Sequence, residues 1–291
     1  MTALSKYNNL TQRIVTGVLG SAAIIYGLIV SEWAYFAIFF IICLFSLREF
    51  YKLAALDGLL PLKIIGMIIG VMIFCLSFFI ERGDISAKYY FVIFPLMALV
   101  YMIKLYNKGE YKPFTNIAFT FLGILYIAVP ISLLNHVLFQ NQSCIRFGIS
   151  LHRTYSFEII LGLLLILWAT DTGAYFAGTF LGKHKLFERI SPKKTWEGFI
   201  GGALLAGIIV FTFNLILQNY GCQYLSVFDW TVITIIIVVG GTFGDLVESL
   251  LKRSIEIKDS GSSIPGHGGF LDRFDGLFIS APFVVAYLEL F

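Results

Sequence analysis

Residues 230–253, WTVITIIIVVGGTFGDLVESLLKR, decide what kind of fold this chain adopts. The stretch contains about as many apolar residues as an α-helix needs to cross the roughly 30 Å core of a bilayer. Its second half nevertheless carries Asp245, Glu248, Ser249 and Lys252, whose spacing of three, four and seven residues places them on one helix face. The stretch therefore predicts a membrane helix whose polar stripe lines a cavity or a helix interface.

The whole chain has the composition that this helix suggests. Of its 291 residues 58% are hydrophobic and only 13% are charged, whereas soluble domains carry about 25% charged residues. A soluble globule could not hide that much apolar surface, and disorder, collagen, a coiled coil and a disulfide-stapled secreted domain are excluded as well. We expect an all-α, polytopic membrane protein with about nine spans, at residues 13–30, 33–47, 63–80, 88–105, 113–138, 157–181, 197–217, 230–251 and 271–291.

The distribution of basic residues predicts the orientation of these spans. With the N-terminus inside, every one of the 21 Lys and Arg residues falls on the inner side except Arg82, Lys88, Arg146 and Arg153. The positive-inside rule therefore favours an N-in, C-out topology. The predicted location is the cell (inner) membrane, with the large basic loops on the cytoplasmic side.

Function is expected in the second half of the chain. Residues 1–150 have short loops with charges at the loop ends, which is typical of transmembrane scaffold helices, whereas residues 151–291 carry charged residues within the helices. Asp171, inside an apolar run, would cost about 2.5–3.5 kcal/mol at a helix centre and should face a polar partner or cavity. The sequence does not decide whether Cys144 and Cys222, both in predicted loops, form a disulfide.

The segment from residue 252 to residue 275 has the composition of a phosphate-binding loop. It is rich in Gly and Ser, so its backbone N–H groups can point at an anion. It also carries four cations, suited to phosphates, and flanking carboxylates, suited to the divalent metal that accompanies a nucleoside triphosphate. His267 has no Cys or second His nearby to complete a zinc site.

A second basic loop ends in Ser191-Pro192-Lys193-Lys194-Thr195. Ser191 or Thr195 can cap the helix that follows, whose N-terminal amides form another phosphate site beside the two lysines. In that helix Gly198 and Gly202 have a small-xxx-small spacing, which serves either packing between helices or a homodimer contact.

Together these residues resemble a known family. The pattern Ser249-x-Leu251-Lys252-Arg253, Lys258-Asp259 and Pro265-x-His267-Gly268-Gly269-x-x-Asp272-Arg273-x-Asp275 is similar to the signature of the phosphatidate cytidylyltransferases, or CDP-diacylglycerol synthases. The stretches 171–175 and 191–198 also match recurrent stretches of that family. The resemblance covers residues 168–275 and says nothing about residues 1–150 beyond their hydrophobic character.

The resemblance implies a magnesium-dependent reaction of CTP with phosphatidate that yields CDP-diacylglycerol and pyrophosphate. It implies Asp245 and Asp272 as metal ligands, with Asp275 as a further candidate and a second metal ion left open. Expected partners are CTP, phosphatidate and membrane lipid, with no nucleic acid. The predicted catalytic and substrate-binding residues are Asp245, Asp272, Lys252, Arg253, Lys258, Ser191, Lys193, Lys194, Thr195, His267, Gly268, Gly269, Arg273 and Asp171.

Two other functions are compatible with some of these features. A CTP-dependent polyprenol or dolichol kinase would use the same nucleotide but would transfer the γ-phosphate to a lipid alcohol. An ion-coupled transporter would use intramembrane carboxylates, but it would leave the Gly-rich loop without a role.

Overall fold

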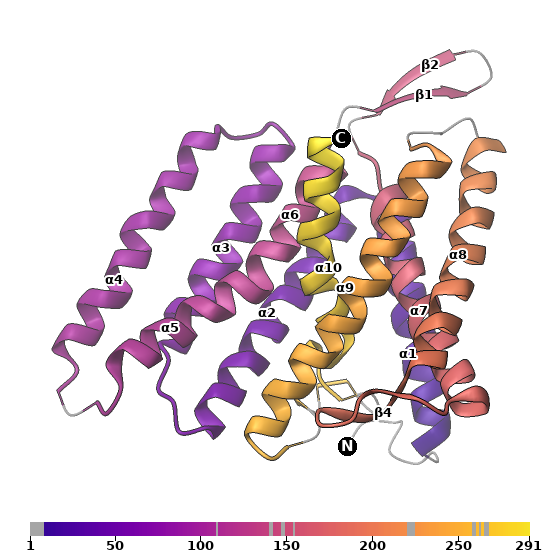
Figure 1. Ribbon diagram of the computed structural model, residues 1–291. Coiled ribbons are helices and arrows are strands. Elements are labelled where there is room, and N and C mark those ends of the chain that lie inside the picture. Colours follow the sequence, from indigo (N-terminus) through magenta and orange to yellow (C-terminus); the bar gives the residue numbers. More distant parts are fainter. Residues whose placement is uncertain are drawn as a thin grey trace. The chain divides into compact units, whose positions relative to one another are not determined.

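The computed structural model of the chain describes residues 9–108, 110–139, 142–146, 149–153, 155–219, 225–257, 260–261, 263–264 and 268–291. These residues are mainly helical, as expected (Figure 1). In order, the elements are α1 (Asn9–Val30), α2 (Glu32–Leu56), α3 (Lys63–Glu81), η2 (Ala87–Val92), α4 (Ile93–Tyr106), α5 (Pro113–Gly123), η3 (Ile124–Ala128), α6 (Val129–Leu138), β1 (Gln142–Arg146), β2 (Ile149–Arg153), α7 (Glu158–Leu181), β3 (Lys185–Phe187), β4 (Ser191–Thr195), α8 (Trp196–Asn219), α9 (Val227–Ser254) and α10 (Leu271–Leu290).

The helices are those of a multi-pass membrane protein. Among the described residues, seven helical segments are long and apolar enough to cross a bilayer: Glu32–Leu56, Lys63–Glu81, Ala87–Tyr106, Pro113–Leu138, Glu158–Leu181, Trp196–Asn219 and Val227–Ser254. The other two predicted spans are also helical, but Val15–Val30 is shorter, and α10 carries Asp272, Arg273 and Asp275 in its first turns. The all-α membrane class is confirmed, whereas the number of nine spans and the orientation stay predictions.

The second predicted span was too short. Residues 33–47 were expected to end before Arg48 and Glu49, yet α2 continues for more than two further turns, to Leu56. Charged residues at a span end normally mark the membrane surface, but Glu49 is buried, at 4% exposure. Glu49 therefore does not mark the end of this helix.

The chain divides into two compact units, residues 1–132 with 252–274 and residues 133–251 with 275–291. Both α9 and α10 contribute to each unit, because each helix passes from one to the other within its own length. The expected division by role, scaffold in 1–150 and catalysis in 151–291, stays a prediction.

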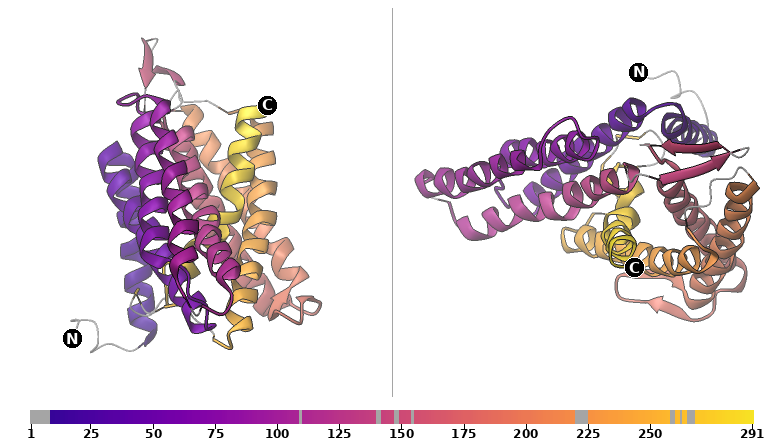
Figure 2. Two further views of the ribbon diagram at one scale, coloured as in Figure 1. Left: turned by 90° about the vertical axis from the view of Figure 1, so that its left-hand side faces the viewer. Right: turned by 90° about the horizontal axis from the view of Figure 1, so that it is seen from above.

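In the first unit α2 packs against α1 and α3, and α3 packs against α4 and η3. In the left view of Figure 2 these indigo to magenta helices run side by side. Tyr51 shows how tightly they fit: its hydroxyl donates to Thr120 O at 2.6 Å, and its ring lies where a Cβ at Gly66 or Gly123 would be.

In the second unit α7 and α8 pack most closely, joined by the antiparallel β3–β4 hairpin (Figure 1). Glycines allow the approach: a Cβ at Gly202 would lie 2.7 Å from Thr170 O, and one at Gly198 would lie 2.9 Å from Ala174 O. Gly198 and Gly202 thus serve packing within one chain, and the homodimer stays a prediction.

Candidate functional site

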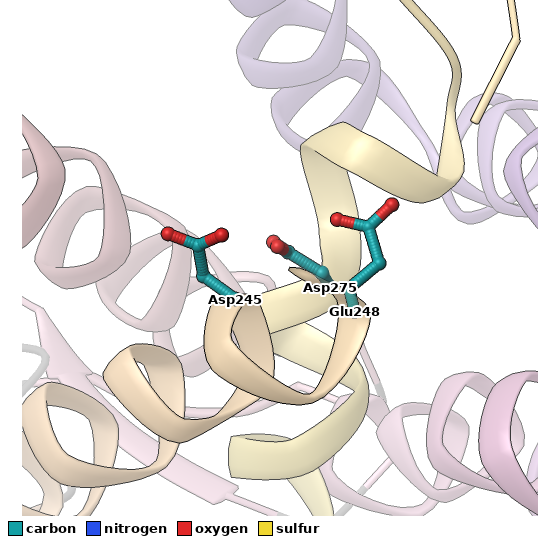
Figure 3. A group of neighbouring side chains, drawn as sticks. All are labelled: Asp245, Glu248 and Asp275. Atoms are coloured by element: carbon teal, nitrogen blue, oxygen red, sulfur yellow. The ribbon is translucent and has the colours of Figure 1, made fainter. Parts of the chain in front are cut away.

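Three acidic side chains meet in the second unit. Asp245 and Glu248 of α9 and Asp275 of α10 each bring a carboxylate oxygen within 4.8 Å of the others. Figure 3 shows the three carboxylates directed toward one another. Glu248 is buried, at 1% exposure, while Asp245 and Asp275 are partly exposed. Like charges this close repel, so added positive charge would stabilise the group, which we call the acidic cluster.

Small residues bring the two helices of this cluster together. A Cβ at Gly244 would lie 2.5 Å from Asp275 O and 2.8 Å from Gly276 Cα, so only glycine fits there. One turn away, a Cβ at Gly240 would lie 3.0 Å from Ser280. Because Asp245 follows Gly244 and Asp275 precedes Gly276, this backbone contact sets the separation of their carboxylates.

Lys194 supplies a positive charge at the edge of the acidic cluster. Its Nζ lies 2.5 Å from Asp245 Oδ2 and donates to Thr242 O at 3.3 Å. The Asp245 side chain is 43% exposed, and its Oδ1 accepts a hydrogen bond from Ser249 Oγ at 3.3 Å. The lysine is therefore accessible to an anion and the carboxylate to a cation.

The strand that carries Lys194 also starts α8. Thr195 is buried, and its Oγ1 accepts a hydrogen bond from Gly198 N at 3.1 Å, so Thr195 caps the helix as expected. Of the other predicted residues in this strand, Lys193 is exposed and Ser191 is partly exposed. Asp171, on α7 in the same unit, is exposed as well.

The donor set of the acidic cluster suits a hard divalent cation. Its three residues offer only carboxylate oxygens, the ligands that Mg²⁺ prefers, and no sulfur or imidazole that would favour zinc. Mg²⁺ needs about six ligands and normally keeps several waters or substrate oxygens. Three carboxylates at a partly open position meet that need.

Asp272 lies in the first unit, in a different environment. Its Oδ1 lies 2.7 Å from Lys252 Nζ, and its Oδ2 accepts hydrogen bonds from Ser260 N and Gly269 N, both at 3.0 Å. These donors take up most of the acceptor sites that the Asp272 carboxylate would offer to a metal ion. Its role as a metal ligand stays a prediction.

The rest of the Gly-rich loop is described in part. Gly268 has φ +85°, a conformation that favours glycine, and its carbonyl accepts a hydrogen bond from Ile264 N at 2.9 Å. Arg253 and Arg273 are exposed. Lys258 and His267 lie outside the described residues.

Two residues join these sites without having been predicted in them. Glu248 was recognised on the polar stripe but was given no role, although its spacing of three from Asp245 was a signal for shared ligation. Glu49 was missed because its position beside Arg48 is typical of a span end. In the first unit Glu49 accepts hydrogen bonds from the same loop that holds Asp272.

Comparisons with known proteins show which family the chain resembles. The sequence profile of the cytidylyltransferase family matches residues 11–291. A phosphatidate cytidylyltransferase of Bacillus subtilis (strain 168) is 34% identical over 288 residues, which cover 97% of this chain and 99% of that protein. Proteins of the same name from Staphylococcus epidermidis (strain ATCC 12228 / FDA PCI 1200) and Staphylococcus aureus (strain COL) are 45% and 46% identical over 130 residues, 45% of this chain and 48% of each relative.

Proposed function

The chain belongs to the cytidylyltransferase family, and we propose that it is a phosphatidate cytidylyltransferase of phospholipid biosynthesis. Its substrates are CTP and phosphatidate, and its products are CDP-diacylglycerol and pyrophosphate. The observation that carries the proposal is the acidic cluster with Lys194 at its edge, because such a site can hold a metal–nucleotide complex.

The reaction needs positioning and charge neutralisation more than proton transfer. A phosphate oxygen of phosphatidate attacks the α-phosphorus of CTP, a new P–O bond forms, and the bond to the β-phosphate oxygen breaks to release pyrophosphate. The attacking oxygen is already anionic at neutral pH, so no general base is required. Because both reactants are anions, cationic groups that hold them together lower the barrier.

In this proposal Asp245, Glu248 and Asp275 hold Mg²⁺. When bound, Mg²⁺ supplies positive charge to the phosphate oxygens of CTP. Lys194 binds a phosphate oxygen beside Asp245 and orients the nucleotide toward the lipid phosphate. Lys193 and Arg273, both exposed, each offer a further cation to the substrate phosphates.

The Gly-rich loop of the first unit offers further groups that can bind phosphate. Lys252 is held by Asp272, so its ammonium has a defined position from which to contact a phosphate. Arg253, Lys258 and His267 contribute further donors in the same segment. Asp272 acts through Lys252 and the loop backbone.

The membrane setting suits a lipid substrate. With the N-in orientation favoured by the basic residues, both basic loops face the cytoplasm, where CTP is available. The acyl chains of phosphatidate stay in the bilayer while its phosphate reaches the end of α9. We place the enzyme in the cell (inner) membrane.

The test is to supply the purified protein with Mg²⁺, phosphatidate and CTP labelled at the α-phosphate. We expect label in CDP-diacylglycerol and release of unlabelled pyrophosphate, with no lipid product when phosphatidate is omitted. A parallel reaction with polyprenol as acceptor tests the lipid kinase. Release of CDP with phosphorylation of polyprenol would contradict the proposal.

A further inference from the structure

The carboxylate of Glu49 is buried against the Gly-rich loop of the first unit. Its Oε1 accepts a hydrogen bond from Ser263 Oγ at 2.6 Å. Its Oε2 accepts hydrogen bonds from Leu271 N at 2.9 Å and from Ser260 Oγ at 3.4 Å. A carboxylate at 4% exposure is costly unless donors surround it, and here the loop supplies the donors.

One of these bonds fixes the start of α10. Leu271 is the first residue of the helix, and its N–H belongs to the first turn, where backbone donors have no partner within the helix. Glu49 caps this N–H from α2, more than 200 residues earlier in the chain. Negative charge at a helix N-terminus also interacts favourably with the helix dipole.

The backbone of the loop passes so close to Glu49 that side chains are excluded. A Cβ at Gly261 would lie 2.8 Å from Glu49 Oε1, and a Cβ at Gly269 would overlap Glu49 Oε2 and Ser260 Oγ. The two glycines therefore let the loop fold around the carboxylate. The sequence showed a Gly-rich loop but not the group around which it folds.

The same loop residues also hold Asp272. Ser260 donates its N–H to Asp272 and its hydroxyl to Glu49. Gly269 donates its N–H to Asp272 and lies against Glu49. A displacement of Glu49 would move both N–H groups that orient Asp272, and with them the position of Lys252.

We propose that Glu49 is a positioning residue for the reaction: it holds Ser260, Gly269 and the start of α10 in the positions from which the loop binds the substrate phosphates. This inference rests on the proposed function and deepens it, because it assigns a role in substrate binding to a helix of the scaffold region. Glu49 touches neither substrate nor metal, and acts through Ser260, Gly269 and Asp272.

The decisive experiment compares Glu49→Gln with the wild type in the CDP-diacylglycerol assay. Gln keeps the shape of Glu but loses the charge and one acceptor, so the loop loses one or two charge-assisted hydrogen bonds. We expect kcat/KM for CTP to fall roughly 10- to 100-fold, mainly through a higher KM. Glu49→Asp, which keeps the charge, should recover part of the loss.

The split between KM and kcat separates positioning from a purely structural role. Loss of folded protein would lower the apparent kcat and leave KM for CTP unchanged. A Glu49→Gln protein that is folded and has a lower kcat with an unchanged KM for CTP would therefore overturn the proposal. Glu32→Gln is the matched control, because Glu32 lies at the other end of α2 and pairs with Arg82 at 3.0 Å. Its KM should equal that of the wild type.

A second variant covers the case in which Glu49→Gln does not fold. Ser263→Ala removes only one donor to Glu49, from an exposed residue, and should raise KM for CTP severalfold. An unchanged KM in this variant would then overturn the proposal. If the wild type itself makes no CDP-diacylglycerol, the proposed function fails instead.

The geometry can also be tested without the reaction. Trypsin can cut on either side of the loop, after Arg253 in the last turn of α9 and after Arg273 in the first turn of α10, both exposed. Glu49→Gln should be cut there faster than Glu32→Gln, and equal rates would contradict the anchoring of the loop.

Discussion

The first unit and the second unit surround their acidic residues in opposite ways. In the first unit Glu49 and Asp272 are surrounded by hydroxyl, amide and ammonium donors of one loop. In the second unit Asp245, Glu248 and Asp275 converge on one another. A carboxylate surrounded by donors holds protein structure in place, whereas carboxylates that share a small volume attract a cation from outside.

If this contrast is correct, the largest loss of activity should follow from the acidic cluster. We expect Asp245→Asn to reduce Mg²⁺-dependent turnover by at least about 100-fold, because it removes a charged metal ligand and the partner of Lys194. The measurement is CDP-diacylglycerol formation as a function of Mg²⁺ concentration. Asp229→Asn, on the same helix but bonded to Ser226 and Tyr287, is the control and should keep its activity.

Asp272→Asn tests the other side of the contrast. We expect a loss of roughly 10- to 100-fold in kcat/KM for CTP, because Lys252 and the loop lose charge-assisted hydrogen bonds. The Mg²⁺ concentration that gives half of the maximal rate should not change. A strong shift of that concentration, equal to the one in Asp245→Asn, would break the contrast and support Asp272 as a metal ligand.

Gly244→Ala tests whether the close backbone contact between α9 and α10 sets the separation of the carboxylates in the acidic cluster. The new methyl group would lie 2.5 Å from Asp275 O, so α9 and α10 must separate, and overpacking of this kind costs about 1–3 kcal/mol. We expect a roughly tenfold loss of turnover together with a lower unfolding temperature. Gly207→Ala, where a Cβ meets nothing within 4 Å, should leave both unchanged.

The smallest effect on turnover should come from Glu110, in the connection between α4 and α5. Burial raises the pKa of this carboxyl, but hydrogen bonds from Lys104 and Asn116 outweigh burial and hold the pKa below its usual value of 4.5. The ionised carboxylate of Glu110 therefore stabilises the folded protein fully above about pH 4.5. This stabilisation is lost as the pH falls through the lowered pKa of Glu110 in the folded protein.

Glu110→Gln should accordingly lower the unfolding temperature by several °C at pH 7, without changing turnover. The difference from the wild type should shrink on going to pH 4 or below, as thermal unfolding in detergent would show. A constant difference across this range would mean that the charge of Glu110 does not contribute. Asp84→Asn, which removes an exposed partner of Arg82, should have little effect at either pH.

The sequence predicted most of the helices and part of the acidic cluster. Periodicity placed Asp245 and Glu248 on one stripe, because both belong to one helix and their spacing is visible. Thr195 could also be predicted as a helix cap, because a capping side chain bonds to residues close to it in sequence. The position of Asp275 beside Asp245 was not visible in the periodicity, because it depends on a backbone contact between Gly244 and a second helix.

The burial of Glu49 could not be predicted from the sequence, for a different reason. A carboxylate beside an arginine at the end of an apolar run has the pattern of a membrane boundary, and burial by a distant loop leaves no local signal. A related feature of the sequence was the presence of Gly261 and Gly269, which allow the loop to pass close to another group. Sequence patterns report local geometry well and partners across 200 residues poorly.

The bond between Glu49 and Leu271 also has a consequence for biogenesis. The two residues are separated by 222 positions, so at about 5–20 residues per second the ribosome needs roughly 10 to 45 s to supply the donor after the acceptor. Until then the Glu49 carboxylate lacks this donor, and burying it is more costly. A residue of α10 thus completes the hydrogen bonding of an acid on α2, and a chain that stops before residue 271 leaves Glu49 without the Leu271 N–H.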